Sequence, residues 1–132
     1  MKAKFTINGK LPGLNDYTLD CRRNAYSGAQ MKRIAQELCM WSAKQQCKVK
    51  FTKPVWIYYD FYEPDRRRDK SNIAAFAVKV IEDAMVQLQI IHDDGWKYIE
   101  NYTQSFNIDK ARPRIEVYIT DEWEGENESS SV

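Results

Sequence analysis

The chain has 132 residues, of which 43% are apolar, and its 20 Lys and Arg nearly balance 19 Asp and Glu. This length suits one domain with its own core. No apolar run approaches the roughly 20 residues that cross a bilayer, and the N-terminus lacks a secretory signal, so we expect a cytoplasmic protein without a membrane segment. Three cysteines without a CxxC spacing and a single histidine argue against a zinc site or a disulfide framework.

The first half of the chain predicts a strand, a loop and one helix. Residues 4–8 alternate as a short strand does, and the Gly, Pro and Asn of residues 9–16 are typical of a loop. Over residues 28–48 apolar side chains recur near the helical period, with Ser27 as the expected cap. These apolar positions are Met31, Ile34, Ala35, Leu38, Met40, Trp41 and Ala43. They predict an amphipathic helix.

The second half predicts three strands and one further helix. Residues after Pro54 to Tyr62 are β-branched and aromatic, and residues 98–107 and 114–120 also have strand character. Between them, residues 70–89 form a helical pattern with Asp69 as its N-cap. Its expected buried stripe consists of Ile73, Ala77, Val80, Ile81, Ala84 and Leu88.

These elements predict the fold class and the domain limits. We expect an α+β single domain over residues 1–120, with a mixed β-sheet and two principal α-helices packed on it. Residues 121–132 contain five acids and no base, and we expect this acidic tail to be disordered.

Acidic residues lie inside the most basic segment of the chain. Asp65 and Asp69 flank Arg66, Arg67 and Arg68, and a second acid pair, Asp93 and Asp94, follows the predicted helix. Carboxylates on a surface that binds a polyanion would repel it, unless a divalent cation lies between them and the phosphate. The pattern therefore suggests a metal site beside a phosphate-binding surface.

The predicted helix carries a second group of polar residues. Asn72, Lys79 and Asp83 fall within about 40° of one another beside the apolar stripe. However, about 20 residues of helix span about 30 Å, so Asp69 and Asp94 cannot meet across it. They meet only if a turn folds back or if a partner chain brings its own copy.

Each polar feature also has an ordinary structural interpretation. Asp69 can serve only as a helix cap, and Asp93-Asp94-Gly95 only as a turn. The arginines can be a solvated surface run, and Lys79 and Asp83 an i,i+4 ion pair. These alternatives stay open from the residues alone.

The combination of these residues resembles the RusA family of Holliday junction resolvases, including its phage-type members. The resemblance rests on Arg66-Arg67-Arg68-Asp69, on Asn72, Lys79 and Asp83, and on the run from Asp93 to Ile99. Leu11 to Asn15, Arg22-Arg23 with Tyr26, and residues 113–117 also resemble that family's pattern, so the likeness extends to about Thr120.

The resemblance implies a homodimeric endonuclease that resolves four-way DNA junctions with Mg²⁺, or with Mn²⁺, and uses no small-molecule cofactor. It implies catalytic roles for Asp69, Lys79 and Asp94, and metal ligands at Asp69 and Asp94, with Asp93 and Asp83 as further candidates. We expect the DNA-binding residues to be Arg22, Arg23, Arg66, Arg67, Arg68, Lys70 and Asn72. The family's motif at the helix start reads Asp-x-Asp-Asn, and Ser71 stands here at the second aspartate.

Two other function classes remain open. A noncatalytic module for DNA or DNA junctions would use the arginines alone, with a degenerate metal site at Ser71, and would bind without metal. An interaction protein would instead use exposed aromatics such as Trp96 and Trp123, together with the acidic tail, to contact a basic partner.

Overall fold

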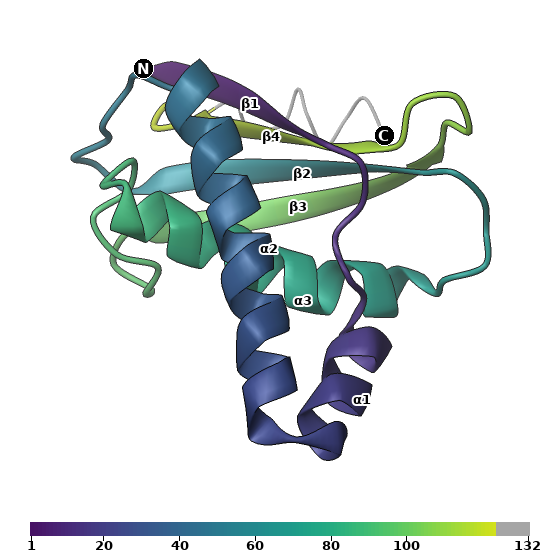
Figure 1. The fold of residues 1–132 in the computed structure, drawn as a ribbon. Coiled ribbons are helices and arrows are strands. Elements are labelled where there is room, and N and C mark those ends of the chain that lie inside the picture. The colour runs from purple at the N-terminus through teal and green to yellow at the C-terminus, as the bar shows by residue number, and fades with distance from the viewer. Residues whose placement is uncertain (124–132) are drawn as a thin grey trace.

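The computed structural model describes residues 1–123 of the chain, which form a four-stranded sheet and three helices (Figure 1). The elements in chain order are β1 (Lys2–Asn8), α1 (Leu14–Arg23), α2 (Ala25–Gln46), β2 (Val55–Glu63), α3 (Lys70–Gln87), β3 (Ile99–Ile108) and β4 (Arg114–Thr120). The predicted α+β class with a mixed sheet is confirmed.

The sheet has the strand order β1-β4-β2-β3. Strand β2 pairs antiparallel with β4 and parallel with β3, and β1 pairs antiparallel with β4. A parallel pair needs a crossover connection, and α3 supplies it between β2 and β3. This β2-α3-β3 unit places α3 and the loop after it beside β3, an edge strand whose residues are mostly exposed.

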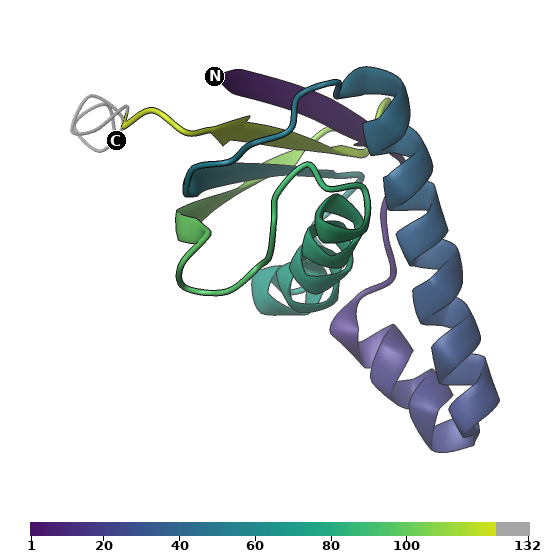
Figure 2. The same cartoon turned by 90° about the vertical axis from the view of Figure 1, so that its left-hand side faces the viewer.

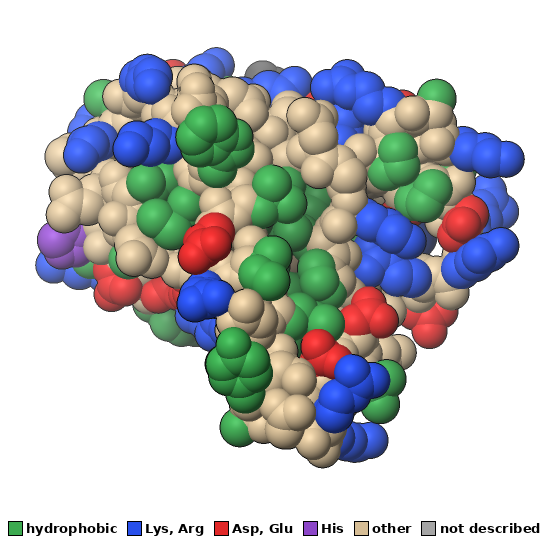
Figure 3. Space-filling model, viewed as in Figure 1, with side chains coloured by type: hydrophobic (Ala, Val, Ile, Leu, Met, Phe, Trp, Pro, Cys, Tyr) green, Lys and Arg blue, Asp and Glu red, His purple; other side chains and the backbone are tan. Residues whose placement is uncertain are grey.

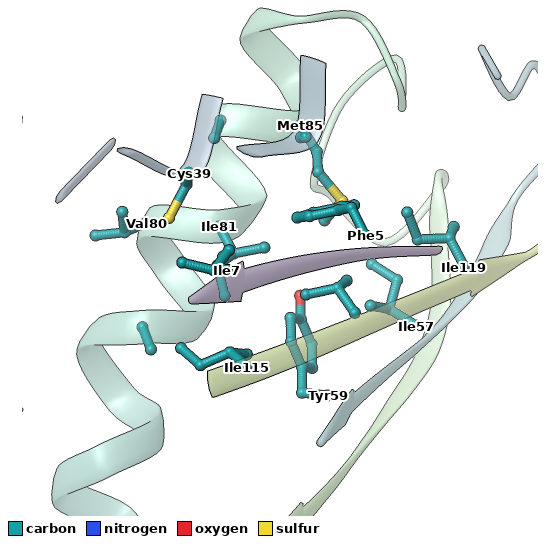
Figure 4. Packing of buried hydrophobic residues seen from close by; sticks show 14 of the residues in the cluster. Phe5, Ile7, Cys39, Ile57, Tyr59, Val80, Ile81, Met85, Ile115 and Ile119 are labelled. Carbon is teal, nitrogen blue, oxygen red and sulfur yellow. The ribbon is translucent and has the colours of Figure 1, made fainter. Parts of the chain in front are cut away.

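The core lies between one face of the sheet and the helices α2 and α3. Alternate residues of β2 are buried, as expected for a sheet with one covered face. They meet apolar side chains of α3, including Val80 and Ile81, and the thiol of Cys39 from α2 (Figure 4). Burial raises the pKa of the Cys39 thiol to about 12, so this cysteine acts as a small hydrophobe.

Helix α1 was not expected, because residues 9–16 were predicted to be a loop and only two principal helices were expected. None of its residues is buried, and Leu14, Tyr17 and Cys21, which recur at the helical period, are too few to distinguish a short helix from a loop in the sequence. Its first turn is held instead by polar contacts: Asp16 accepts a hydrogen bond from the Gly13 backbone, and Asn72 of α3 accepts one from Asn15. Contacts from a distant element cannot be read from local spacing.

Helix α2 begins earlier than predicted, and the face that it turns to the core is not the one with its largest apolar residues. Its N-cap is Asn24, whose side chain accepts a 2.7 Å hydrogen bond from the Ser27 backbone, so Ser27 is not the cap. Its buried residues are Gly28, Ala35, Cys39, Ser42 and Ala43. Gly28 lets α1 approach, since a Cβ there would lie 2.5 Å from the sulfur of Cys21. Small residues therefore form the covered face, and several of the large apolar residues of α2 are exposed.

Two features concern the ends and the outline of the molecule. Helix α1 and the beginning of α2 project away from the sheet (Figure 2). The N-terminal amine of Met1 binds Asp121 at 2.8 Å, just after β4. Most of the predicted acidic tail lies outside the described residues. Among the residues described, no helix is long and apolar enough to cross a membrane.

Candidate functional site

Lys79 lies between two carboxylates on the outer side of α3. Its Nζ donates to Oδ2 of Asp94 at 2.9 Å and lies 3.1 Å from Oδ1 of Asp83, one helical turn further along. Asp94 comes from the loop after α3, so the fold returns this loop onto the middle of the helix. Of the predicted site residues, the fold thus brings Lys79, Asp83 and Asp94 together, and we call these three residues the Lys79 cluster.

The loop that carries Asp94 is anchored at both ends. Ile90 and Ile91 are buried in the core before it, and the Gly95 carbonyl accepts hydrogen bonds from the backbones of Tyr98 and Ile99 after it. Asp93 accepts a hydrogen bond from the Asp94 backbone at 2.8 Å, and its position is exposed. Asp93 therefore shapes the turn, while Asp94 points to Lys79.

The charges of the Lys79 cluster stabilise one another. Hydrogen bonds to Asp94 and Asp83 raise the pKa of Lys79 above its ordinary value. The hydrogen bond from Lys79 lowers the pKa of Asp94. Lys32 of α2 also lies 3.8 Å from Asp83, which adds a second positive charge at that carboxylate. The contacts of the cluster thus favour the charged forms of Lys79 and Asp94.

Glu82 is a further member that the sequence did not indicate. The hydroxyl of Tyr59, a buried residue of β2, donates to Glu82 at 3.0 Å. Burial raises the pKa of Glu82, and the neighbouring Asp94 raises it further. Its spacing of three residues from Lys79 places both on adjacent positions of α3, which is the signal that could have identified it.

Asp69 lies away from the Lys79 cluster. It precedes α3 at the N-cap position, without a side-chain capping hydrogen bond, and ten residues separate it from Lys79, roughly 15 Å of helix rise. In Figure 1 the β2–α3 loop and the loop after α3 lie at opposite ends of the molecule. One copy of the chain therefore does not bring Asp69 and Asp94 to the same ion, which is the separation that the helix length predicted.

The arginines at the start of α3 differ in their surroundings. Arg66 and Arg67 are exposed, and the Arg67 side chain lies 3.7 Å from the carboxylate of Asp65. Arg68 is 16% exposed, binds both carboxylate oxygens of buried Glu63, and donates to the Leu11 carbonyl. Arg68 therefore joins the β2–α3 loop to the N-terminal segment and is not free to bind phosphate.

An open hollow of about 820 Å³ adjoins these arginines at the C-terminal end of β3. Its lining includes Asp65, Arg66, Asp69, Lys70, Ser71 and the β3 residues Phe106 to Ile108. Lysine and arginine side chains gather at this end of the molecule (Figure 3). Ser71 is exposed there, next to Asp69 and Lys70, so the position expected to carry a second motif aspartate faces solvent. The hollow thus contains Arg66 and Lys70 of the predicted basic patch, together with Arg68, whose guanidinium is held by Glu63.

Asn72 and the arginines of α1 occupy other positions. The side-chain oxygen of Asn72 accepts a 2.8 Å hydrogen bond from the Asn15 backbone, and a Cβ at Gly13 would lie 2.7 Å from its amide nitrogen. The side-chain oxygen of Asn72 therefore fixes the start of α1. Arg22 and Arg23 are exposed at the last turn of α1, where positive charge is favoured by the helix dipole.

The donor groups of the Lys79 cluster partly fit a magnesium ion. Mg²⁺ in proteins is usually held by one or two carboxylates and keeps several waters. Asp83 and Asp94 both approach the same cationic nitrogen, so two carboxylates already converge on one positive charge. No group of three or more His, Cys, Asp or Glu residues in residues 1–123 has the geometry of a metal site. A site at the cluster would thus rest on two carboxylates.

Comparison with known proteins adds no relative to this description. No protein-family model matches the chain. No curated protein matches its sequence either. The geometry of the Lys79 cluster and of the basic hollow therefore carries the functional argument.

Proposed function

We propose that the protein is a magnesium-dependent endodeoxyribonuclease that resolves four-way DNA junctions. The observation that carries this proposal is the Lys79 cluster, in which a lysine and two carboxylates from separate segments converge at an exposed position. The exposed arginines at the start of α3 support it, because a phosphodiester substrate needs positive charge along its backbone. The resemblance to RusA resolvases supports the choice of a branched substrate.

The residues of the chain have distinct roles in this proposal. Arg66, Arg67 and Lys70 bind backbone phosphates and hold the DNA along α3. Lys79 donates to a non-bridging oxygen of the scissile phosphate and stabilises the negative charge that develops as the bond to the leaving oxygen breaks. Asp94 holds Lys79 in position, since their 2.9 Å hydrogen bond fixes the ammonium group.

A magnesium ion fits this proposal at Asp94 and Asp83. When bound, it would supply Lewis acidity and lower the pKa of a bound water. Asp69 lies at the start of α3, away from the Lys79 cluster. It would bind the ion only if a second protomer supplied it or if the β2–α3 loop changed its conformation. Glu82, whose pKa is raised by burial, would donate or accept a proton beside Asp94.

A noncatalytic DNA-binding module is the second candidate, and a specific observation favours it. Ser71 replaces an expected carboxylate, and no three-carboxylate metal group occurs among residues 1–123. In this case the arginines bind DNA and the acids only shape the loops. Asp94→Asn distinguishes the two candidates: metal-dependent cleavage that this variant loses favours the nuclease, whereas a pure binding module binds DNA in chelator and cuts in no metal.

The experiment that tests the proposal compares a synthetic four-way junction with a linear duplex of matched sequence. Each is incubated with the protein in Mg²⁺, in Mn²⁺ and in a chelator, and the labelled strands are separated under denaturing conditions. Paired cuts in the junction, dependent on the metal and absent from the duplex, are the expected result. Junction binding without cuts in either metal would favour the binding module, and absence of binding to both DNAs at low salt would reject both candidates.

A further inference from the structure

One side of α2 carries large apolar side chains that the other residues of the range 1–123 leave uncovered. Ile34, Leu38 and Trp41 are 56%, 41% and 66% exposed, and Met31 before them is half-buried. Their separations of three, four and three residues match the apolar seam of a coiled coil. We call these four residues the α2 seam. Exposed apolar surface of this kind marks an interaction site more often than a free surface.

The α2 seam is also free of charge. At about 100° of rotation per residue, the same side of α2 carries only the seam residues and uncharged neighbours. These neighbours are Ser27, Gln30 and Gln45. The charged residues of α2 lie elsewhere: Glu37, Lys44 and Arg33, whose Nε lies 4.0 Å from Glu37, border the seam on one flank, and Lys32, which reaches Asp83, lies on the far side. The covered face of α2, built from small residues, is distinct from the seam.

We propose that the α2 seam is the dimer interface, in which α2 packs antiparallel against α2 of a second copy of this chain around a two-fold axis. A two-fold interface uses the same surface on both protomers, so it must be complementary to itself. When Leu38 lies opposite the partner's Trp41, Glu37 comes next to the partner's Lys44, and Lys44 next to the partner's Glu37. Opposite charges thus flank the apolar contact on both sides of the axis, which favours a second copy over an unrelated partner.

The other register of this antiparallel pair is disfavoured. When Ile34 lies opposite the partner's Leu38, the two Glu37 carboxylates face each other, and like charges across an interface are repulsive. The charged residues beside the seam therefore select one register. Because Lys32 and α3 lie on the far side of α2, dimerisation through the seam leaves the Lys79 cluster accessible in both protomers.

This inference deepens the proposed function, since symmetric cleavage of a junction needs two sites related by a two-fold axis. It is nevertheless tested without DNA or metal, so its failure is distinct from failure of the nuclease. The mass of the full-length chain is measured by light scattering after gel filtration, over a wide range of concentrations. Leu38→Glu and Trp41→Glu are the test variants, and Trp96→Glu, at a fully exposed aromatic outside the seam, is the matched control.

We expect the parent and Trp96→Glu to be dimers with similar dissociation constants. Each seam variant should have a dimer dissociation constant at least tenfold higher than that of the parent. Circular dichroism checks that the variants fold. We expect them to fold because the substituted side chains are exposed. A monomeric parent, or a dimer that survives both seam substitutions, would overturn the proposal. A dimer dissociated only by Trp96→Glu would place the interface at the loop after α3.

A charge exchange tests the register. Lys44→Glu places acids against acids and should weaken the dimer, whereas the double variant Glu37→Lys with Lys44→Glu restores opposite pairs and should recover the parent affinity. If the double variant is as weak as the single one, the antiparallel register is wrong.

Discussion

Lys79 and Asp94 are fifteen positions apart in the sequence and are joined by a 2.9 Å hydrogen bond between Nζ and Oδ2. Their contact exists because α3 is followed by a short loop that turns back along it. The helical lysine thereby gains a carboxylate that its own helix cannot supply, and the pair is exposed beside β3. The functional proposal depends on this relationship.

Lys79→Met should abolish most of the cleavage while leaving junction binding nearly unchanged. Removing one group that stabilises developing charge typically lowers a catalytic rate constant by about 10²–10³-fold. Lys79→Arg keeps the charge and should retain more activity than Lys79→Met. Single-turnover cleavage and gel-shift binding, measured side by side, separate the two effects. Equal losses of binding and cleavage in Lys79→Met would instead make Lys79 a simple phosphate contact.

Arg66 and Arg68 should respond to alanine substitution in different ways. Arg66 is exposed, so Arg66→Ala should weaken DNA binding and reduce the slope of log K against log salt by about 0.9 without loss of stability. Arg68→Ala leaves buried Glu63 unpaired, which should lower the free energy of unfolding by about 3 kcal/mol. Salt titrations of binding and urea unfolding measure the two effects. Similar stability losses in both variants would contradict the distinction.

Asn72→Ala should loosen α1 rather than weaken a DNA contact. Its side chain accepts the hydrogen bond of the Asn15 backbone in the first turn of that helix, and loss of such a cap costs about 1 kcal/mol. Hydrogen exchange should speed up in α1 and stay unchanged in β2. If exchange is unaffected and junction affinity falls, Asn72 binds DNA, as the resemblance implied.

Glu82→Gln should stabilise the protein more at neutral pH than in acid. Burial raises the pKa of Glu82 in the folded state, so between the unfolded and folded pKa values the folded state holds more protons. Stability therefore falls as pH rises through that window, and the amide removes this loss. Thermal unfolding of the parent and Glu82→Gln from pH 4 to pH 7 measures the difference in their stabilities. Glu100→Gln, on exposed β3, is the control. A constant difference between Glu82→Gln and the parent across this range would contradict the raised pKa.

The strands and α3 could be predicted from the sequence because their apolar residues repeat at the period of the element. The observed β4 matches residues 114–120, and α3 begins at Lys70 as expected. Helix α1 could not be predicted, because its start depends on Asn72 from another helix. The exposed side of α2 was also missed, since an apolar stripe has the same period whether it faces the core or a partner chain.

Part of the candidate site could also be predicted. Lys79 and Asp83 are neighbours by helical spacing alone, but the approach of Asp94 depends on how the loop after α3 folds. The spacing of three residues from Lys79 could have indicated Glu82, but its contact with Tyr59 of β2 could not be predicted from local spacing. Arg68 looked equivalent to its neighbours in the sequence, and only burial against Glu63 distinguishes it from them.

The most direct test of the central claim is single-turnover cleavage of a four-way junction in Mg²⁺ by the parent, Asp94→Asn and Asp93→Asn, with binding measured in chelator. The account predicts that Asp94→Asn binds the junction as the parent does and cuts it at least about 10²-fold more slowly. Asp93→Asn, which alters only the turn, should keep most of the activity. Parent-like cleavage by Asp94→Asn would contradict the assignment of the Lys79 cluster as the active site.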